Sequence, residues 1–296
     1  MFFPAFLRTR WAALQPLWAR MLQRPEKLLS LHSLLWALIA AGLALLLYVL
    51  VLIPFTPGIR DIRKAKTEQP AQLVAADGKL LAEYRWVNRA WVPLSDIAPP
   101  VVGALIATED HRFYGHWGLD WRRTASAVVR TLGGDKQGGS TITQQLARNL
   151  YPEEIGRAPT LTRKLKEAIT ALKIEASYSK DEILETYLNT VPFLYNAYGI
   201  EMAARTYFDK SADKLNVLES ATLIGMLKGT AYYNPVLNPE RAQARRNTVL
   251  SQMVKRGKLD AKQFETLQKR PLRINFERQT EVMGPAPHFA IQLRKQ

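Results

Sequence analysis

The stretch Glu109-Asp-His-Arg-Phe-Tyr-Gly-His-Trp-Gly118 places two carboxylates directly after a run of apolar residues at helical spacing. Leu105 precedes Glu109 by about one turn, so in a helix that begins near Pro100 the glutamate continues the apolar face. A carboxylate at that place lies in a partly desolvated cleft, where it can act as a general base. A Glu-Asp pair taken alone is more often a solvated helix end, so the neighbouring sequence has to decide.

A second polar stretch, Gly138-Gly-Ser-Thr-Ile-Thr-Gln-Gln145, ends a glycine-rich run that begins at Gly133. Its hydroxyl and amide groups suit the hydroxyls of a sugar and the oxygens of a phosphate. These candidate substrate-binding residues are Ser140, Thr141, Thr143, Gln144 and Gln145. The run is not a nucleotide-binding phosphate loop, because no Gly-Lys-Ser or Gly-Lys-Thr follows the glycines. Gly-Gly-Ser-Thr alone is more often a linker or a helix start.

A third stretch, Arg163-Lys-Leu-Lys-Glu167, combines cations with a glutamate. Arg163 and Glu167 are four residues apart, and on a helix such a pair is usually a surface ion pair worth about 0.3 kcal/mol. Two further segments follow, Glu182-Ile-Leu-Glu-Thr-Tyr-Leu-Asn189 and Arg245-Arg-Asn-Thr-Val-Leu-Ser-Gln-Met253.

In this order, the five stretches resemble the motifs of the peptidoglycan glycosyltransferase family. That family occurs in class A penicillin-binding proteins and as monofunctional enzymes. The resemblance runs from about Leu73 to Arg270, and five ordered motifs make chance agreement very small. It implies a mainly α, lysozyme-like glycosyltransferase domain that polymerises a lipid-linked disaccharide pentapeptide into β-1,4 glycan strands.

The resemblance also assigns roles to the acidic motifs. Glu109 is the base that takes the proton from the acceptor sugar's 4-hydroxyl as that oxygen attacks C1 of the donor, and a single displacement of this kind inverts the configuration. Glu167 organises the donor side. Asp110, Phe113 and His116 complete the first motif as its supporting residues.

Cations hold the donor diphosphate in this family. The matching candidates are Arg148, Arg163 and Lys164, with Arg157 a weaker fourth. Positive charge placed there stabilises the leaving diphosphate most in the transition state. Arg148 stands where the family commonly has lysine, so a planar fork replaces a compact ammonium. A divalent cation, Mg²⁺ or Mn²⁺, on the diphosphate is compatible with the family, but no ligand cluster in the sequence requires a metal.

The last two motifs are expected to be mainly architectural. Glu185 is predicted to be a buried polar residue that shapes the donor pocket, with Asn189 beside it in the same motif. For Arg246, an approach to the diphosphate and a surface position remain open. Leu194 and Asn196 stand where glycines are frequent in the family, which leaves the shape of that loop undecided.

A membrane segment precedes these motifs. Residues 31–54 carry no charge and are long enough to cross a hydrocarbon core of about 30 Å. Residues 1–30 form a basic and aromatic tail. Basic residues flank both sides of the segment, so the positive-inside bias is weak. The family places the N-terminus in the cytoplasm and the catalytic domain on the outer side of the bacterial inner membrane.

The remaining boundaries follow from composition and turn signals. Residues 55–94 read as a juxtamembrane linker and a β-hairpin, with Asp77-Gly78 as its turn. Residues 95–270 form the glycosyltransferase domain, and residues 271–296 a C-terminal connector or tail. The 296 residues contain no cysteine, and 41 Lys and Arg against 26 Asp and Glu give a net charge of +15. That excess fits a membrane surface or phosphate-bearing substrates, and no nucleic-acid reading element accompanies it.

Other functions remain as alternatives. A glycan hydrolase on the same fold also needs two carboxylates, but it has no use for a phosphate-binding cation cluster. A membrane-tethered scaffold would not need both glutamates. The sequence contains no Ser-x-Asn or Lys-Thr-Gly motif of a penicillin-sensitive transpeptidase. Whether the chain is a monofunctional enzyme or a piece of a bifunctional one stays open. The expected partners are the lipid-linked monomer, the growing strand, membrane lipids and the cell-wall synthesis machinery.

Overall fold

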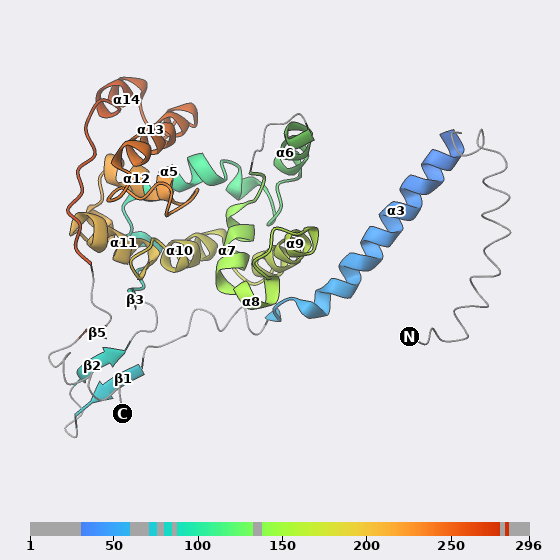
Figure 1. The fold of residues 1–296 in the computed structure, drawn as a ribbon, viewed down its shortest axis with the longest axis horizontal. Coiled ribbons are helices and arrows are strands. Elements are labelled where there is room, and N and C mark those ends of the chain that lie inside the picture. Colours follow the sequence, from blue (N-terminus) through green and yellow to red (C-terminus); the bar gives the residue numbers. More distant parts are fainter. Residues whose placement is uncertain are drawn as a thin grey trace. The chain divides into compact units, whose positions relative to one another are not determined.

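The computed structural model describes residues 31–59, 71–75, 80–84, 88–132, 138–278 and 282–283. The chain divides into two compact units, Met1–Phe55 and Thr56–Gln296, and each is described by itself (Figure 1). The predictions for the N-terminal tail, the Asp77-Gly78 turn and most of the C-terminal connector lie outside the described residues.

In the first unit, helix α3 (Leu31–Leu52) continues into the short 3-10 helix η1 (Ile53–Phe55). The span His32–Phe55 has a mean hydropathy of 2.7 over its most apolar window. Most of its leucine side chains are exposed. By length and composition this helix is sufficient to cross a membrane, as the uncharged segment predicted.

The second unit begins with a small sheet. Strands β1 (Ala71–Val74) and β2 (Leu80–Tyr84) pair antiparallel, and β5 (Val282–Met283) pairs with the other edge of β2. The pairing of β1 with β2 confirms the predicted hairpin. A separate two-stranded parallel sheet joins β3 (Asn88–Arg89) and β4 (Ala197–Tyr198).

Helices form most of the second unit, which confirms the mainly α prediction (Figure 1). They are α5 (Pro99–Glu109), α6 (Trp121–Leu132), α7 (Ile142–Leu150), α8 (Pro152–Ile155), α9 (Leu161–Glu175), α10 (Lys180–Thr190), α11 (Gly199–Phe208), α12 (Val217–Met226), α13 (Pro239–Lys255) and α14 (Ala261–Leu267). Short 3-10 helices lie at Leu94–Asp96, Phe113–Gly115 and Ala212–Lys214. One continuous core of buried apolar side chains connects these helices.

Capping residues define where several helices begin. At α7, the Thr141 hydroxyl accepts the Gln144 N–H, and the Gln144 side chain accepts the Thr141 N–H. Ser179 and Glu182 form the same reciprocal pair at the start of α10. Because such boxes satisfy backbone donors that the helix leaves unpaired, they fix the first turn. Helix α7, which follows the predicted hydroxyl-rich stretch, therefore has a defined start.

Helix α5 lies in the middle of the packing that positions Glu109. It contacts α12 and α13, while α7 contacts α9 and α10. Val101, Ala104 and Leu105 of α5 are fully buried. Glu109 is the last residue of α5 and Asp110 its C-cap, so the helix ends at the carboxylate pair. The predicted helix is confirmed, and the structure adds that it ends at Glu109.

The loop between α10 and α11 has an unusual backbone. Leu194, Tyr195 and Asn196 all have positive φ, at 68°, 50° and 60°. A left-handed conformation costs about 1–2 kcal/mol for most non-glycine residues. The backbone thus takes the left-handed conformation although Leu194 and Asn196 are not glycines. Gly199 closes the loop at φ 80°, and a Cβ there would lie 2.6 Å from the carbonyl oxygen of Asn189.

Candidate active site

Glu109 is held by a neutral amide. The Gln145 Nε2 donates a hydrogen bond of 2.9 Å to Glu109 Oε2, and the Glu109 side chain is 13% exposed. The cation recorded near this carboxylate is Arg245, whose Nη2 lies 4.0 Å from Oε1. The carboxylate is thus oriented by one short hydrogen bond, and its nearby cation is farther away than a hydrogen-bonded ion pair requires.

Tyr187 determines how the Gln145 amide is oriented. Its hydroxyl donates a hydrogen bond of 2.9 Å to Gln145 Oε1. Burial, with the Glu109 charge adding to it, raises the pKa of Tyr187 well above its usual value, so the phenol keeps its proton and acts as the donor. The Gln145 oxygen is therefore occupied, and its N–H faces Glu109. The geometry gives Gln145 a role in positioning the Glu109 carboxylate, and its predicted contact with substrate stays a prediction.

Two arginines near Glu109 were not among the sequence candidates. Arg245 stands directly before the candidate Arg246, and its guanidinium also lies 5.8 Å from the centre of the Tyr233 ring. Arg123 donates to the main-chain carbonyl of Glu109 and to that of Gly138. The double arginine of the fifth stretch was a signal for Arg245, but only the direction of each side chain separates it from its neighbour.

Asp110 joins the first two motifs. Its side chain is buried, and both oxygens lie 3.0 Å from His116 Nε2. Asp110 Oδ2 also accepts the Ile142 N–H at the start of α7, at 3.1 Å. Phe113 is fully buried and packs edge-on against the His116 ring. These three supporting residues of the first motif therefore fix the place where α7 begins.

Three of the predicted substrate-binding residues are buried and bonded within the protein. Thr141 Oγ1 donates to the Gly118 carbonyl at 2.6 Å, and Thr143 Oγ1 donates to Glu175 Oε1 at 2.7 Å. Gln144 closes the capping box described above. The geometry favours a structural role for Thr141, Thr143 and Gln144. Their contact with substrate stays a prediction, and their burial does not favour it.

Glu167 lies among cations. Its side chain is 1% exposed, and its two oxygens lie 3.1 Å from Arg163 Nη1 and 2.6 Å from Lys164 Nζ. Lys164 Nζ also donates to Ser140 Oγ at 2.9 Å, which brings the start of the glycine-rich stretch to the same place. The structure therefore brings together four of the predicted site residues, Ser140, Arg163, Lys164 and Glu167.

The other two predicted cations differ in their surroundings. Arg148 is half-buried on α7, and its charge acts on the buried Tyr187 hydroxyl, which places it on the Glu109 side. Arg157 is 80% exposed and pairs with the equally exposed Glu153 at 2.8 Å. An exposed pair of this kind contributes little. The weaker candidate is thus placed in a surface ion pair.

Glu185 and Asn189, the candidates of the fourth motif, form hydrogen bonds to a distant segment of the chain. Glu185 accepts the Trp91 indole N–H at 3.0 Å and the Leu94 N–H at 3.1 Å. Asn189 is buried and bonds both the N–H and the carbonyl of Val92. These contacts fasten residues 91–94 to α10. The architectural role expected for this motif agrees with its hydrogen bonds.

Arg246 is buried, at 1% exposure. Its Nη2 donates to the Arg270 carbonyl at 2.7 Å, and its other recorded bonds go to Asn247 and to the Gln268 carbonyl. The surface position considered for Arg246 is therefore wrong. Its approach to a diphosphate stays a prediction, and none of its recorded partners belongs to the Glu109 or Glu167 surroundings.

Residues 77–254 match the family model described as transglycosylase. The chain belongs to the transglycosylase family. The family predicted from the five motifs is thereby confirmed, and the matched range contains Glu109, Glu167 and all the cation candidates.

Several curated proteins are similar to this transglycosylase. Penicillin-binding protein 1A of Escherichia coli (strain K12) is 40% identical over 82% of this chain and 28% of its own length. Penicillin-binding protein 2D of Bacillus subtilis (strain 168) is 42% identical over 75% of this chain and 32% of its own length. The crystal structure of penicillin-binding protein 1A from Haemophilus influenzae has 25% identity and a TM-score of 0.42, over 77% of this chain and 24% of that chain. The chain thus spans about a third or less of these relatives.

Helix α7 connects the two acidic sites of this transglycosylase. Ser140, just before the helix, bonds Lys164 of the Glu167 cluster, and Gln145, within the helix, bonds Glu109. These two positions are roughly 7 Å apart along a helix axis. One short helix therefore carries a contact to each carboxylate, so the two sites share a rigid support.

The chemistry available at the two sites differs. Among the described residues, no group of three or more His, Asp or Glu side chains is arranged to hold a metal ion. Glu109 offers a carboxylate free of a close ion pair, and the Glu167 cluster offers positive charge held in place by a buried carboxylate.

Proposed function

We propose that this transglycosylase polymerises a lipid-linked disaccharide pentapeptide into β-1,4 glycan strands. The observation that carries the proposal is the chain of hydrogen bonds from Tyr187 through Gln145 to Glu109. It fixes one carboxylate oxygen and leaves the other, Oε1, without a close ion pair. That oxygen is available to accept a proton, as a general base must.

In the proposed reaction, the acceptor's 4-hydroxyl gives its proton to Glu109. The same oxygen forms a bond to C1 of the donor sugar while the bond from C1 to the diphosphate oxygen breaks. The polyprenyl diphosphate leaves with that electron pair on its phosphate oxygen, and one displacement inverts the configuration at C1. No water enters the bond that forms, which separates this reaction from hydrolysis.

The Glu167 cluster is proposed to receive the donor diphosphate. Lys164 is 43% exposed, so its ammonium reaches solvent while Glu167 holds it from the buried side. Arg163, at 14% exposure, is more firmly fixed. Charge on the leaving group grows towards the transition state, and cations already in place stabilise it there at no cost of reorganisation. Arg148 on α7 is the third proposed contact.

The test of the base compares wild-type protein with Glu109→Gln in detergent, using labelled lipid-linked disaccharide pentapeptide. The amide keeps the shape of the side chain but cannot take the proton, so we expect polymer formation to fall about 1,000-fold, within the usual range for loss of a general base. Glu153→Gln is the control, because Glu153 is 79% exposed in a surface pair. Polymer formed equally by both variants, or cleavage of finished glycan by the wild type, would refute the proposal.

The test of the cations uses Lys164→Ala. We expect a KM for the lipid-linked donor about tenfold higher, the size of one lost charge-assisted hydrogen bond. Arg157→Ala, which removes an 80% exposed cation, is the matched control and should leave KM unchanged. Equal KM values for the two variants would remove Lys164 from the diphosphate site. Repeating the assay with a chelator tests whether Mg²⁺ or Mn²⁺ assists on the substrate diphosphate.

We also propose that α3 crosses the bacterial inner membrane with the N-terminus in the cytoplasm and the transglycosylase unit outside. The chain has no cysteine, so an introduced thiol is its single labelling site, and the purified chain reports that site alone. Ser251→Cys, on the exposed side of α13, should react with a membrane-impermeant maleimide in whole spheroplasts. Labelling only after lysis would reverse the proposed orientation. Cell-wall synthesis proteins are the proposed partners beyond the lipids and the glycan strand.

A further inference from the structure

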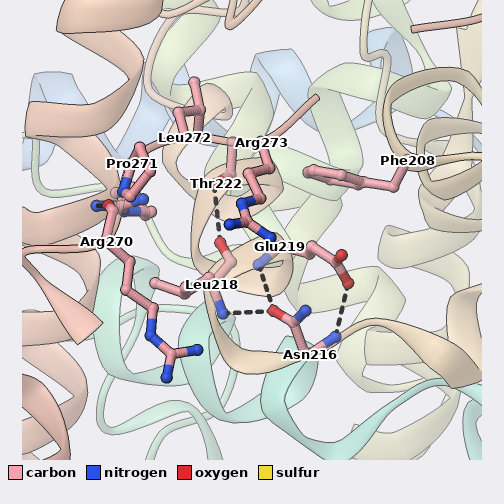
Figure 2. A pocket seen from close by; sticks show the side chains of 10 residues that line it. Phe208, Asn216, Leu218, Glu219, Thr222, Arg270, Pro271, Leu272 and Arg273 are labelled. Carbon is pink, nitrogen blue, oxygen red and sulfur yellow. Dashed lines mark hydrogen bonds between the residues drawn. The ribbon is translucent and has the colours of Figure 1, made fainter. Parts of the chain in front are cut away.

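A cavity of about 290 Å³ lies where the start of α12 meets the segment that follows α14. Figure 2 shows its side chains, among them Asn216, Glu219, Arg270, Leu272 and Arg273. A more open depression of about 570 Å³ shares Asn216, Leu218 and Arg270 with it. The residues around both hollows include none of the predicted catalytic residues, so this site is separate from the Glu109 and Glu167 sites.

The cavity is lined in part by a buried charge without a carboxylate partner. Arg246 lines the cavity at 1% exposure, and its recorded bonds go to an amide oxygen and two main-chain carbonyls. No ion pair between Arg246 and a described acidic residue is present. Burial lowers the pKa of this guanidinium, which reflects the cost of leaving the charge away from water. A buried cation of this kind is stabilised by an anion.

Among the described residues that line the cavity, the single acidic one, Glu219, is already engaged. Glu219 Oε1 pairs with Lys210 at 2.7 Å, and Glu219 Oε2 accepts the Asn216 N–H at 2.9 Å. Arg270 and Arg273, in contrast, are exposed, and their side chains make no ion pair with a described residue. The lining therefore keeps the charge of three guanidinium groups without a carboxylate to neutralise them.

The start of α12 adds to this positive field. Asn216 is its N-cap, and the helix runs for ten residues from Val217. The Asn216 side chain already accepts the N–H groups of Leu218 and Glu219, so these two donors are engaged and the helix contributes its dipole. The three arginines remain the groups that would bond a ligand.

We propose that this cavity binds the phosphate group of a small phosphorylated ligand, through Arg246, Arg270 and Arg273. As a ligand for three guanidinium groups, a phosphate dianion is a better match than a carboxylate, which carries only one charge. The planar fork of arginine also bonds phosphate oxygens in pairs. The volume exceeds that of a bare phosphate, and Leu218 and Leu272 border the remaining space. An organic group attached to the phosphate therefore has room beside the arginines.

The test titrates the full-length protein in detergent with inorganic phosphate, against chloride at equal ionic strength. A ligand that binds the folded state raises the melting temperature with its concentration, so the midpoint reports its affinity. In Arg270→Ala/Arg273→Ala we expect phosphate affinity to fall at least about tenfold, because charge-assisted hydrogen bonds are lost. Lys255→Ala/Lys269→Ala removes the same charge from exposed lysines outside the cavity, and it should keep wild-type affinity.

Two results would overturn the proposal. One is equal phosphate affinity in the two double variants. The other is loss of phosphate binding in Lys164→Ala alone, which would place the bound phosphate at the Glu167 cluster. Glycerol phosphate and phosphatidic acid vesicles, compared on the wild type, then distinguish a soluble ester from a lipid headgroup as the source. Because Arg270 and Arg273 lie outside the proposed catalytic residues, polymerisation by the double variant should continue, so the two proposals can fail separately.

Discussion

Glu109 and Glu167 are the same residue type in opposite surroundings. Glu109 is 13% exposed, takes a hydrogen bond from a neutral amide, and has its recorded cation at 4.0 Å. Glu167 is 1% exposed and lies 3.1 Å and 2.6 Å from two cations. A carboxylate between two cations fixes the positions of those cations, as Glu167 does for Arg163 and Lys164. A carboxylate bonded to an amide keeps its second oxygen away from a close ion pair, as Glu109 does. The two surroundings fit the different roles proposed for the two glutamates.

The largest stability effect is expected from Glu167→Gln. The amide leaves Arg163 charged and mostly buried without its partner, and breaking a buried pair from one side costs about 3 kcal/mol in the free energy of unfolding. Lys164 adds less to this cost, because its exposed ammonium can turn to solvent. Urea denaturation in detergent measures the loss.

Glu109→Gln is the reference for that measurement. Its hydrogen-bond partner is neutral, so the amide replacement should cost less than about 1 kcal/mol. Both variants are expected to lose polymerisation, but only Glu167→Gln should lose much stability. Equal stability losses would show that the two surroundings do not differ in the way the distances indicate.

A smaller effect, on turnover, is expected from Tyr187→Phe. Without the phenol, the Gln145 Oε1 loses its recorded donor, and only the bond to Glu109 among the recorded contacts opposes a flip that would turn this oxygen towards the carboxylate. We expect kcat to fall about tenfold, which corresponds to about 1.4 kcal/mol. Steady-state polymerisation at saturating substrate measures this.

Tyr207→Phe is the matched control for that variant. Tyr207 is also fully buried, and its hydroxyl donates to the Phe193 carbonyl at 2.6 Å, away from both glutamates. Its loss should lower stability by about 1 kcal/mol and leave kcat unchanged. A kcat lowered equally in both variants would mean that Tyr187 acts only through the packing of the core.

The sequence was sufficient to predict the helices and those side-chain contacts that residues close together in the chain determine. Glu109 lies on α5 as the apolar spacing predicted, and the Glu167 cluster unites residues of the second and third motifs. The sequence was not sufficient to predict in which direction each side chain points. Thr141 and Thr143 carry hydroxyls suited to a sugar, yet both are buried, because the start of α7 uses one and Glu175 uses the other.

Long-range contacts explain the remaining differences. Arg245 and Arg246 are neighbours in the sequence, and only their positions around α13 bring one near Glu109 and the other to the Arg270 carbonyl. Neighbouring helix residues point about 100° apart, so a motif that names both cannot say which faces the site. Leu194 and Asn196 likewise adopt a backbone that favours glycine, because the surrounding fold compensates for the cost.

Asp120 is a third carboxylate that can be compared with Glu109 and Glu167. Its substitution is expected to have a smaller effect on stability than that of Glu167→Gln. Arg112 bonds both of its oxygens, at 2.9 Å and 2.7 Å, and the Arg123 N–H at the start of α6 bonds Oδ1. Burial alone would raise the pKa of Asp120, but the Arg123 N–H and the Arg112 guanidinium outweigh it and hold that pKa below its usual value. The charge therefore stabilises the fold above the unfolded pKa, and this contribution is lost as the pH falls through the folded pKa.

Asp120→Asn keeps the Oδ1 that accepts the Arg123 N–H, removes the charge, and replaces the Oδ2 that accepts from Arg112 Nε by an NH2 group. We expect it to lower the free energy of unfolding by about 1 kcal/mol at neutral pH, because Arg112 is partly exposed and solvent screens the pair. The difference from wild type should shrink as the pH falls below about 4, where the wild-type carboxylate also loses its charge. Urea titrations at several pH values measure it. A difference that persists in acid would mean that the amide disturbs the geometry, and a loss as large as that of Glu167→Gln would mean that partner exposure does not control the strength of these pairs.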